Sequence, residues 1–196
     1  MLVERIKNAL FRRWCVLVQL PRIWWYRMLS HCCVKGKPRI LQPVQIVGRG
    51  SVDFYGKVTL GCYPSPFFFS GYSYIETRTE SGRISIDDGS WINNNFVAIS
   101  VHKGIHIGKK VMIGTNVEIY DSDFHRLDPS QRHICTAEDD REVVIDDNVF
   151  IGSNVKIMKG VHIGKDSVIA NGAIVVKDIP PGVIAGGNPA KILRSL

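Results

Sequence analysis

The sequence has few cysteines and lacks a cysteine motif. Its five cysteines are an odd number, and no two of them have the spacing of a CxxC pair. Disulfide-stapled domains and cysteine-based zinc sites both need regular cysteine spacing. We therefore expect neither a disulfide framework nor a cysteine metal site, as is usual for a reduced cytosolic protein.

Long apolar runs are also missing. The run from Trp14 to Leu20 is interrupted by Gln19 and lies between Arg13 and Arg22. A membrane-spanning helix needs about 20 apolar residues, and the core of a signal peptide needs a longer uninterrupted run than this one. We therefore expect the folded body to stay on the cytoplasmic side of the membrane.

Acidic residues are nearly absent from the first 39 positions. Glu4 stands there against nine Lys and Arg, so this segment carries a charge of +8. The rest of the 196-residue chain holds sixteen basic and seventeen acidic residues and is close to neutral. Attraction to phosphates or anionic lipids is thus a property of the N-terminus. Without a basic face or a recognisable nucleic-acid motif on the body, we expect no nucleic-acid partner.

What the sequence does contain is an aliphatic residue at every sixth position over long stretches. A helix repeats every 3.6 residues and an alternating strand every second residue, so neither produces this period. The aliphatic series are Ile40, Ile46, Val52 and Val58; Ile86, Ile92 and Ala98; Ile107, Ile113 and Ile119; and Ile145, Ile151, Ile157, Ile163, Ile169 and Val175.

Small residues follow many of these aliphatic positions, for example Gly108, Gly152 and Gly164. Small residues are tolerated where a chain turns sharply. Three short strands per coil, with aliphatic side chains stacked inside, would form a triangular prism, and the sequence predicts a parallel β-helix. An ordinary β-sandwich is the alternative, but its irregular strand lengths rarely keep six hits in register.

The repeat breaks at places that predict the domain organisation. We expect a basic helical segment at 1–36, a β-helix at 37–185 with extruded loops near 61–82 and 120–142, and a short closing helix at 186–196. Long loops on a rigid scaffold commonly carry binding and catalytic groups.

Four motifs resemble the hexapeptide-repeat acetyltransferases, the group that includes galactoside, maltose and polysaccharide O-acetyltransferases. They are Asn93–Asn95, the segment IYDSDFH that ends at His125, the coil VFIGSNVKI, and the ending VVKDIPPGVIAGGNPAKIL. The resemblance implies an all-β, left-handed parallel β-helix and a homotrimer. It also implies acetyl-CoA as co-substrate, bound between neighbouring prisms, and no required metal.

His125 holds the position of the family's catalytic histidine. A sugar hydroxyl is a poor nucleophile until a base removes its proton, and a neutral imidazole suits that task near pH 7. Other histidines compete: His106 and His162 each precede a core isoleucine and should face outward. His102 and His106 with His125 could instead form the zinc site of a carbonic anhydrase on this fold, although the DSDFH loop resembles the transferases.

The resemblance also implies binding roles for other residues. Asn95 would bind the acceptor sugar, with an asparagine ladder at a β-helix corner as its alternative. Asp121 and Asp123 are candidates for orienting the imidazole or binding acceptor hydroxyls, or are simply solvated loop carboxylates. The backbone N–H of Ser153 would donate to the oxyanion. The cofactor-binding residues implied are Ser153, Asn171, Val176, Lys177, Lys191 and Arg194.

Residues 1–30 mix bulky apolar residues, among them Trp14 and Trp24, with Arg and Lys. This mixture fits a helix at an anionic membrane surface, and equally a helix packed on the trimer. Membrane contact at the inner face of the cytoplasmic membrane would suit a lipid-linked glycan acceptor.

We therefore expect an acetyl-CoA-dependent O-acetyltransferase for a sugar hydroxyl of a glycan or polysaccharide precursor. A transferase for another small acceptor, such as a xenobiotic or an amino sugar, is the main alternative. A zinc enzyme and a structural β-helix are the others.

Overall fold

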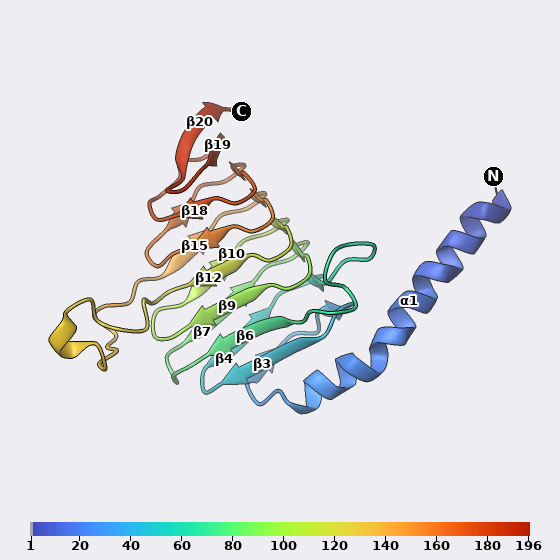
Figure 1. The fold of residues 1–196 in the computed structure, drawn as a ribbon, viewed down its shortest axis with the longest axis horizontal. Coiled ribbons are helices and arrows are strands. Elements are labelled where there is room, and N and C mark those ends of the chain that lie inside the picture. The colour runs from blue at the N-terminus through green and yellow to red at the C-terminus, as the bar shows by residue number, and fades with distance from the viewer. Residues whose placement is uncertain (1) are drawn as a thin grey trace.

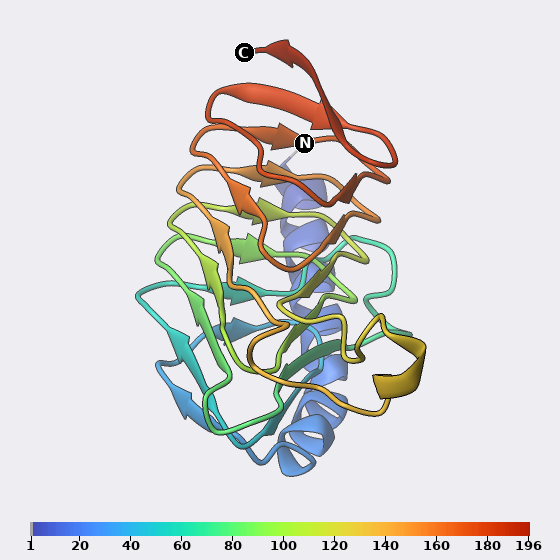
Figure 2. The same ribbon diagram turned by 90° about the vertical axis from the view of Figure 1, so that its left-hand side faces the viewer.

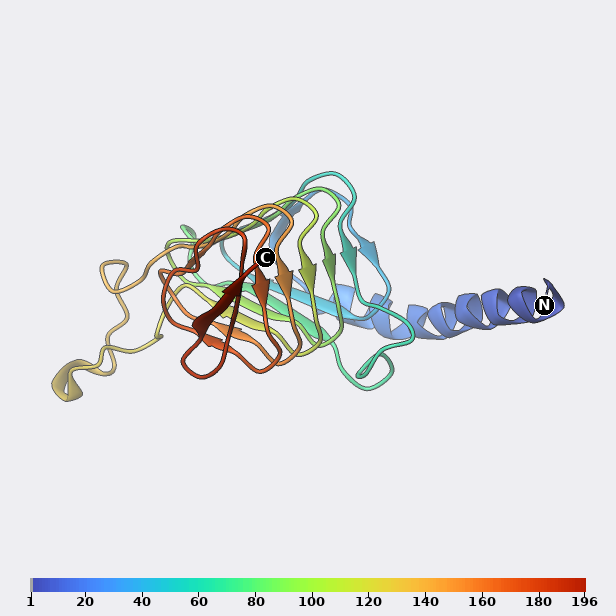
Figure 3. The same cartoon turned by 90° about the horizontal axis from the view of Figure 1, so that it is seen from above.

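The computed structural model describes residues 2–196 as a triangular β-helix prism with one long helix beside it (Figure 1). The coils stack along the prism axis from the N-terminal end to the C-terminal end (Figure 2). The predicted left-handed parallel β-helix is confirmed. Seen from above, helix α1 and the loop at 121–142 project on opposite sides of the prism (Figure 3).

Each wall of the prism is a sheet of parallel strands to which successive coils add one strand, and sheet B ends with the antiparallel strand β20. Sheet A contains β1 (Cys33–Lys35), β4 (Ser51–Phe54), β7 (Arg83–Ile86), β10 (Ile105–Ile107), β13 (Val143–Ile145) and β16 (His162–Ile163). Sheet B contains β2 (Arg39–Ile40), β5 (Thr59–Leu60), β8 (Trp91–Ile92), β11 (Met112–Ile113), β14 (Phe150–Ile151), β17 (Val168–Ile169), β19 (Val183–Gly186) and β20 (Lys191–Ser195). Sheet C contains β3 (Val44–Gly48), β6 (Ser73–Thr77), β9 (Val97–Ser100), β12 (Glu118–Tyr120), β15 (Lys156–Ile157) and β18 (Ile174–Val175).

The six-residue period places aliphatic side chains in register inside the prism. Ile107 pairs with Ile145 in sheet A, and Ile119 pairs with Ile157 in sheet C. All four side chains are fully buried and belong to one continuous core. Burying a side chain of this size contributes about 1.5–3 kcal/mol, so the stacked series is the main stabilising feature of the fold.

The edge between sheets B and C is built from residues with left-handed backbone. Asn95, Asn116 and Asn154 have φ of 60°, 57° and 59°. Asparagine tolerates this conformation better than most residues do. Their side chains form a ladder, in which Asn95 donates to Asn116 at 2.9 Å and Asn116 donates to Asn154 at 2.9 Å. The ladder ties three coils together.

Two predicted boundaries of the β-helix are wrong. The first strand starts at Cys33 rather than after residue 37, because Cys33–Lys35 pairs with Ser51–Asp53. The first extruded loop spans 61–72 rather than 61–82, since β6 is a regular strand of sheet C whose Ile75 is fully buried. The inward neighbours of Ile75 on this strand are polar, Ser73 and Thr77, so the aliphatic pattern did not reveal the strand.

The predicted closing helix at 186–196 is also wrong. Residues 191–195 form strand β20, which runs antiparallel to β19 at the end of sheet B. The last coil otherwise presents unpaired backbone groups at a sheet edge, and β20 pairs them. Bonding the open edge therefore outweighs the weak helix tendency of this segment.

Helix α1 (Leu2–Met28) packs on the sheet through one narrow face. Cys15 and Gln19 are buried on this face, and Cys15 joins a small cluster with Leu41 and Phe68. Gln19 donates to the carbonyl of Phe68, and Arg22 donates to the carbonyls of Phe69 and Gly71. The loop at 61–72 is thus the main attachment point of the helix. Among residues 2–196, no helix has the length and apolar character that crossing a membrane requires.

Candidate active site

His125 lies on the loop 121–142, which leaves the prism at the edge between sheets C and A (Figure 2). We call this segment the His125 loop. It follows β12, contains one short 3-10 helix at Pro129–Gln131, and returns to β13. The side chain of His125 is exposed.

A backbone contact fixes the tautomer of His125. Its Nδ1 lies 2.7 Å from the carbonyl oxygen of Arg132. A carbonyl oxygen accepts hydrogen bonds and cannot donate, so Nδ1 carries the proton in this contact. The lone pair of the neutral ring is then on Nε2. His125 consequently offers a basic nitrogen to the solvent side of the loop.

The residue before His125 has a strained backbone. Phe124 has φ of 63°, a conformation that costs bulky residues about 1–3 kcal/mol and that often marks functional sites. Two contacts hold the ring: the Arg78 guanidinium lies over it at 4.9 Å from its centroid, and the Tyr120 ring packs against it in a T-shaped arrangement with the centroids 5.5 Å apart. The direction of the His125 side chain is therefore set by the prism and not by the loop alone.

Arg126 organises the rest of the His125 loop. Its Nε donates to Asp139 Oδ2 at 2.8 Å, and its Nη2 donates to Thr136 Oγ1 at 3.2 Å. The hydrogen bond from Arg126 lowers the pKa of Asp139 below its ordinary value. A lowered pKa means that the contact stabilises the loop above the ordinary pKa of aspartate, and that this stabilisation is lost as the pH falls through the lowered value.

The two aspartates before His125 have different surroundings. Asp123 pairs with Lys159 at 2.6 Å and lines a small recess together with His125. Asp121 is fully buried, and its carboxylate accepts from Ser100 Oγ and from the backbone N–H groups of Val101, Lys103 and Gly104 at 2.7–3.0 Å. The prediction that Asp121 binds the acceptor is therefore wrong: its oxygens hold the turn that carries His102.

Other predicted site residues lie at the B–C edge, away from the His125 loop. Asn95 stands there in the asparagine ladder, which is the structural alternative given above. The backbone N–H of Ser153 donates to Asn171 Oδ1 at 2.8 Å. The N–H group predicted to bind the oxyanion thus already donates to an amide oxygen. An oxyanion would have to take the place of that oxygen.

The remaining predicted cofactor residues are near the C-terminal end. Val176 and Lys177 follow β18 at the C–A edge, two coils above the start of the His125 loop. Lys191 and Arg194 are exposed on β20. One chain therefore does not gather all the predicted site residues at one place.

The histidines of the zinc alternative have separate partners. His102 Nδ1 lies 2.6 Å from Asp140, and His106 Nδ1 lies 2.8 Å from Ser85 Oγ. Within residues 2–196, one group of potential ligands is close enough to share a metal, namely His102, Cys135 and Asp140. His102, His106 and His125 do not form such a group, so the predicted trio is not assembled in the described chain.

The residues that support His125 were hard to recognise from the sequence. Arg126 and Lys159 had no motif to distinguish them from other surface cations. Asn94, next to the predicted Asn95, is the buried residue of the asparagine run: it accepts from the N–H of Cys62 and donates to the carbonyls of Cys62 and Pro66. Asn94 is buried, whereas Asn93 and Asn95 on either side are only partly buried. In the sequence, an error of one residue in the register of the strand is enough to exchange Asn94 and Asn95.

Comparison with known proteins agrees with this geometry. Residues 142–177 match the family model described as bacterial transferase hexapeptide (six repeats). The coils at 142–177 carry this repeat. The matched coils follow the His125 loop directly, and they contain Ser153, Asn171 and Lys177.

Three similar proteins illustrate the range of identity and coverage. The galactoside O-acetyltransferase of Lactococcus lactis is 31% identical over 142 residues, which cover 72% of this chain and 64% of that protein. The 2,3,4,5-tetrahydropyridine-2,6-dicarboxylate N-acetyltransferase of Clostridium perfringens is 53% identical over 53 residues, or 27% and 22% of the two chains. The solved structure of a hexapeptide-repeat acetyltransferase from Vibrio cholerae has a TM-score of 0.57 and 28% identity, covering 98% and 90%. The chain spans 48–64% of the length of the first curated relatives it matches.

Proposed function

We propose that this protein transfers the acetyl group of acetyl-CoA to a sugar hydroxyl of a glycan or polysaccharide precursor, with His125 as the general base. The observation that carries the proposal is the fixed tautomer of His125: Nδ1 is committed to the Arg132 carbonyl, which leaves Nε2 basic. The names of the Lactococcus and Vibrio relatives support acetyl transfer, and the first supports a sugar hydroxyl as acceptor.

In the proposed reaction His125 Nε2 removes the hydroxyl proton as the oxygen attacks the thioester carbonyl carbon. The tetrahedral intermediate collapses, the C–S bond breaks, and the proton passes from the imidazolium to the leaving thiolate. The products are the O-acetylated sugar and free CoA, and neutral His125 is restored. Direct attack needs alignment of the two substrates and no covalent enzyme intermediate or metal.

The oxyanion would be stabilised by the backbone N–H of Ser153. For this role the Asn171 amide must turn away when the thioester binds, because its Oδ1 accepts that N–H in the free protein. Main-chain donors in a site that excludes water are worth about 2.7–4 kcal/mol to a transition state. Asn171, Val176 and Lys177 would contact the pantetheine arm, and Lys191 and Arg194 the phosphates, for which cations are suited.

A complete site would need a second copy of the chain, and we propose a homotrimer. The residues assigned to base and oxyanion stand at different edges of one prism, which supports a site between copies. The outward row of sheet B supports association as well, since Met112 and Phe150 are 54% and 43% exposed there. The equivalent rows of the other sheets carry polar residues, such as His106 and His162 on sheet A and Glu118 and Lys156 on sheet C.

We further propose that α1 rests on the inner face of the cytoplasmic membrane and that the catalytic body is cytoplasmic. The face of α1 turned to the prism carries Gln19 and Arg22, whereas the face turned away carries Leu10, Trp14 and Trp24, each at least half exposed. An apolar outer face flanked by cations suits an interface with anionic lipid. A lipid-linked glycan acceptor would be reached from there.

Release of free thiol from acetyl-CoA, measured over a panel of sugars, nucleotide sugars and lipid-linked oligosaccharides, tests the function. The proposal expects thiol release that depends on an acceptor hydroxyl and an acetylated sugar in the product. Thiol release only with amine acceptors would contradict it and favour an N-acetyltransferase, for which the Clostridium relative is a precedent.

A further inference from the structure

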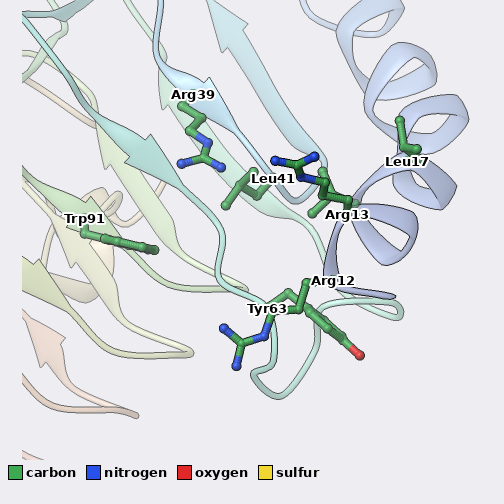
Figure 4. A pocket seen from close by; sticks show the side chains of 8 residues that line it. Arg12, Arg13, Leu17, Arg39, Leu41, Tyr63 and Trp91 are labelled. Atoms are coloured by element: carbon green, nitrogen blue, oxygen red, sulfur yellow. The ribbon is translucent and has the colours of Figure 1, made fainter. Parts of the chain in front are cut away.

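A cleft lies between α1 and the N-terminal coils of sheet B (Figure 4), and α1 projects on the side of the prism opposite to the His125 loop (Figure 3). We call it the α1 cleft. Its volume is about 440 Å³, within the range of ligand sites. The lining residues are Arg12, Arg13, Val16 and Leu17 of α1, Arg39, Leu41 and Trp91 of sheet B and its coil, and Tyr63 of the 61–72 loop.

Three arginines border the α1 cleft without an acidic partner. Arg13 and Arg39 reach toward each other from α1 and β2, and Arg12 lies beside Tyr63 (Figure 4). Among residues 2–196, none of the three makes a side-chain hydrogen bond or an ion pair within the chain. Arg22, between two and three turns further along α1, is by contrast hydrogen-bonded to two loop carbonyls. The cleft therefore presents guanidinium groups that repel one another until an anion binds.

The floor of the α1 cleft is apolar. Leu41 is buried there, and Val16 and Leu17 face it from the helix. Trp91 points into the space, and its indole N–H is already used by the carbonyl of Gly61 at 3.1 Å, which fixes the ring and leaves its face to pack. A free sugar would find few polar partners on such a floor, while an apolar chain would be well accommodated.

The chemistry that satisfies both parts is a phosphate joined to an apolar chain. Arginine binds phosphate through paired N–H donors, and three arginines can surround one phosphate from several sides. The cleft opens beside the apolar outer face of α1, so the distal chain need not be enclosed. The position of the arginines on the helix and on the sheet allows the phosphate to bridge the two.

We propose that the α1 cleft binds one anionic phospholipid molecule, with its phosphate between Arg12, Arg13 and Arg39 and the first part of its acyl chain against Leu41 and Trp91. This proposal rests on the proposed membrane contact of α1 and adds to it a site whose specificity lies partly in the β-helix. Arg39 and Trp91 lie outside α1, and a helix that lies passively on a surface would not need them.

Full-length protein carrying Arg39→Gln tests the site, with Arg49→Gln as the matched control. Arg49 is exposed at the C–A edge, away from the α1 cleft. Arg49→Gln therefore removes the same charge as Arg39→Gln at a different place on the prism. The first probe is a soluble short-chain phosphatidic acid, kept below its critical micelle concentration. Its binding is measured by isothermal titration calorimetry. We expect Arg39→Gln to weaken binding about tenfold and Arg49→Gln to leave it unchanged, with circular dichroism confirming the fold of both. Equal binding by wild type and Arg39→Gln would overturn the proposal.

A second variant, Trp91→Ala, tests the chain-binding floor. We expect it to weaken short-chain phosphatidic acid severalfold while leaving the affinity for inorganic phosphate unchanged. Wild type that binds inorganic phosphate as tightly as the lipid would overturn the proposal in favour of a simple anion site. If assembly of several copies buries the α1 cleft and abolishes lipid binding, the proposal is overturned in favour of a contact between copies.

Vesicles separate this proposal from the membrane contact on which it rests. Co-sedimentation is measured with phosphatidylcholine vesicles with and without phosphatidylglycerol, for the wild type, Arg39→Gln and Trp24→Glu. We expect Trp24→Glu to lose vesicle binding and to bind the soluble lipid as the wild type does. This result would support lipid binding in the α1 cleft independently of the membrane contact. A protein that binds the soluble lipid but no vesicle supports the cleft and contradicts the membrane contact, while acetyl transfer measured in parallel reports on the proposed function.

Discussion

Asp121 shows how a single residue can connect the scaffold to the His125 loop. Its buried carboxylate accepts four hydrogen bonds from the turn at 100–104, and its own carbonyl accepts the N–H of Arg141 at the far end of the His125 loop. One residue thus closes the base of the loop from both sides. Charged acceptors with several backbone donors are among the stronger hydrogen-bonding groups in proteins.

Asp121→Asn should therefore destabilise the fold by about 2–4 kcal/mol, because the new amide group sets N–H against N–H and the charge is lost. Urea unfolding followed by circular dichroism measures the free energy. Asp123→Asn is the control, since its partner Lys159 is partly solvated and the pair contributes about 1 kcal/mol or less. The same small loss for both variants would contradict the anchoring role of Asp121.

At this scale the sequence predicted residue types better than residue roles. His125 and its neighbours follow from the motif, yet the aspartates of the DSD segment look equivalent until the turn at 100–104 is known. Asn94 and Asn95 are similarly alike in sequence. Their roles differ because one points into the core and the other into the corner ladder.

The His125 loop is the element on which the proposed chemistry depends. It lies outside the stacked core, so its order comes from polar contacts centred on Arg126 and from the Phe124 anchor. Few buried apolar contacts mean that it can open at a lower free-energy cost than the prism. Loop order and fold stability should therefore respond separately to substitution.

Arg126→Gln should lower kcat about tenfold and leave the melting temperature within a few degrees of the wild type. The reason is that the glutamine cannot hold Asp139 and Thr136 together, so His125 loses its fixed direction, while the core is unchanged. Steady-state kinetics with varied acetyl-CoA, together with thermal unfolding, measures both. Arg132→Gln is the control, because its carbonyl and not its side chain contacts His125. A fall in stability with no fall in kcat would contradict the positioning role.

Among the elements, those with internal repetition were predictable and those at the ends were not. The hexad period predicted the sheets because the inward side chain decides each strand. Strand β20 was mistaken for a helix because its pairing depends on the open edge of β19, which local sequence does not encode. Helix α1 was predicted, but its polar inner face became visible only with the 61–72 loop in place.

At the scale of the whole molecule, the outer face of α1 and the sheet B row are two of the exposed apolar surfaces among the described residues. Exposed apolar patches of this kind usually mark sites of interaction. The separation of His125 from Ser153 within one chain gives the sheet B row a functional purpose, because association would bring edges of different copies together. The period-six pattern predicts the fold of one prism but gives no information about how several prisms associate.

Phe150→Glu should weaken self-association, since it places a charge in the middle of the apolar row without touching the core. Light scattering after size-exclusion chromatography measures the mass, which the proposal expects to be about three times 22.0 kDa for the wild type and lower for the variant. Tyr55→Glu, at an exposed aromatic residue outside this row, is the control and should stay assembled. An unchanged mass for Phe150→Glu would remove sheet B from the interface.

The rate of acetyl transfer by His125→Asn, measured beside the wild type, tests the role of His125 as general base. The asparagine Nδ2 can still donate to the Arg132 carbonyl, so the loop contact is kept while the basic Nε2 is removed. His133→Asn, on the same loop, is the matched control. With the best acceptor of the panel, we predict that kcat falls at least about a hundredfold in His125→Asn, with little change in the KM for acetyl-CoA and no change in His133→Asn. Equal rates for wild type and His125→Asn would contradict the account, because the proton would then leave the hydroxyl without His125.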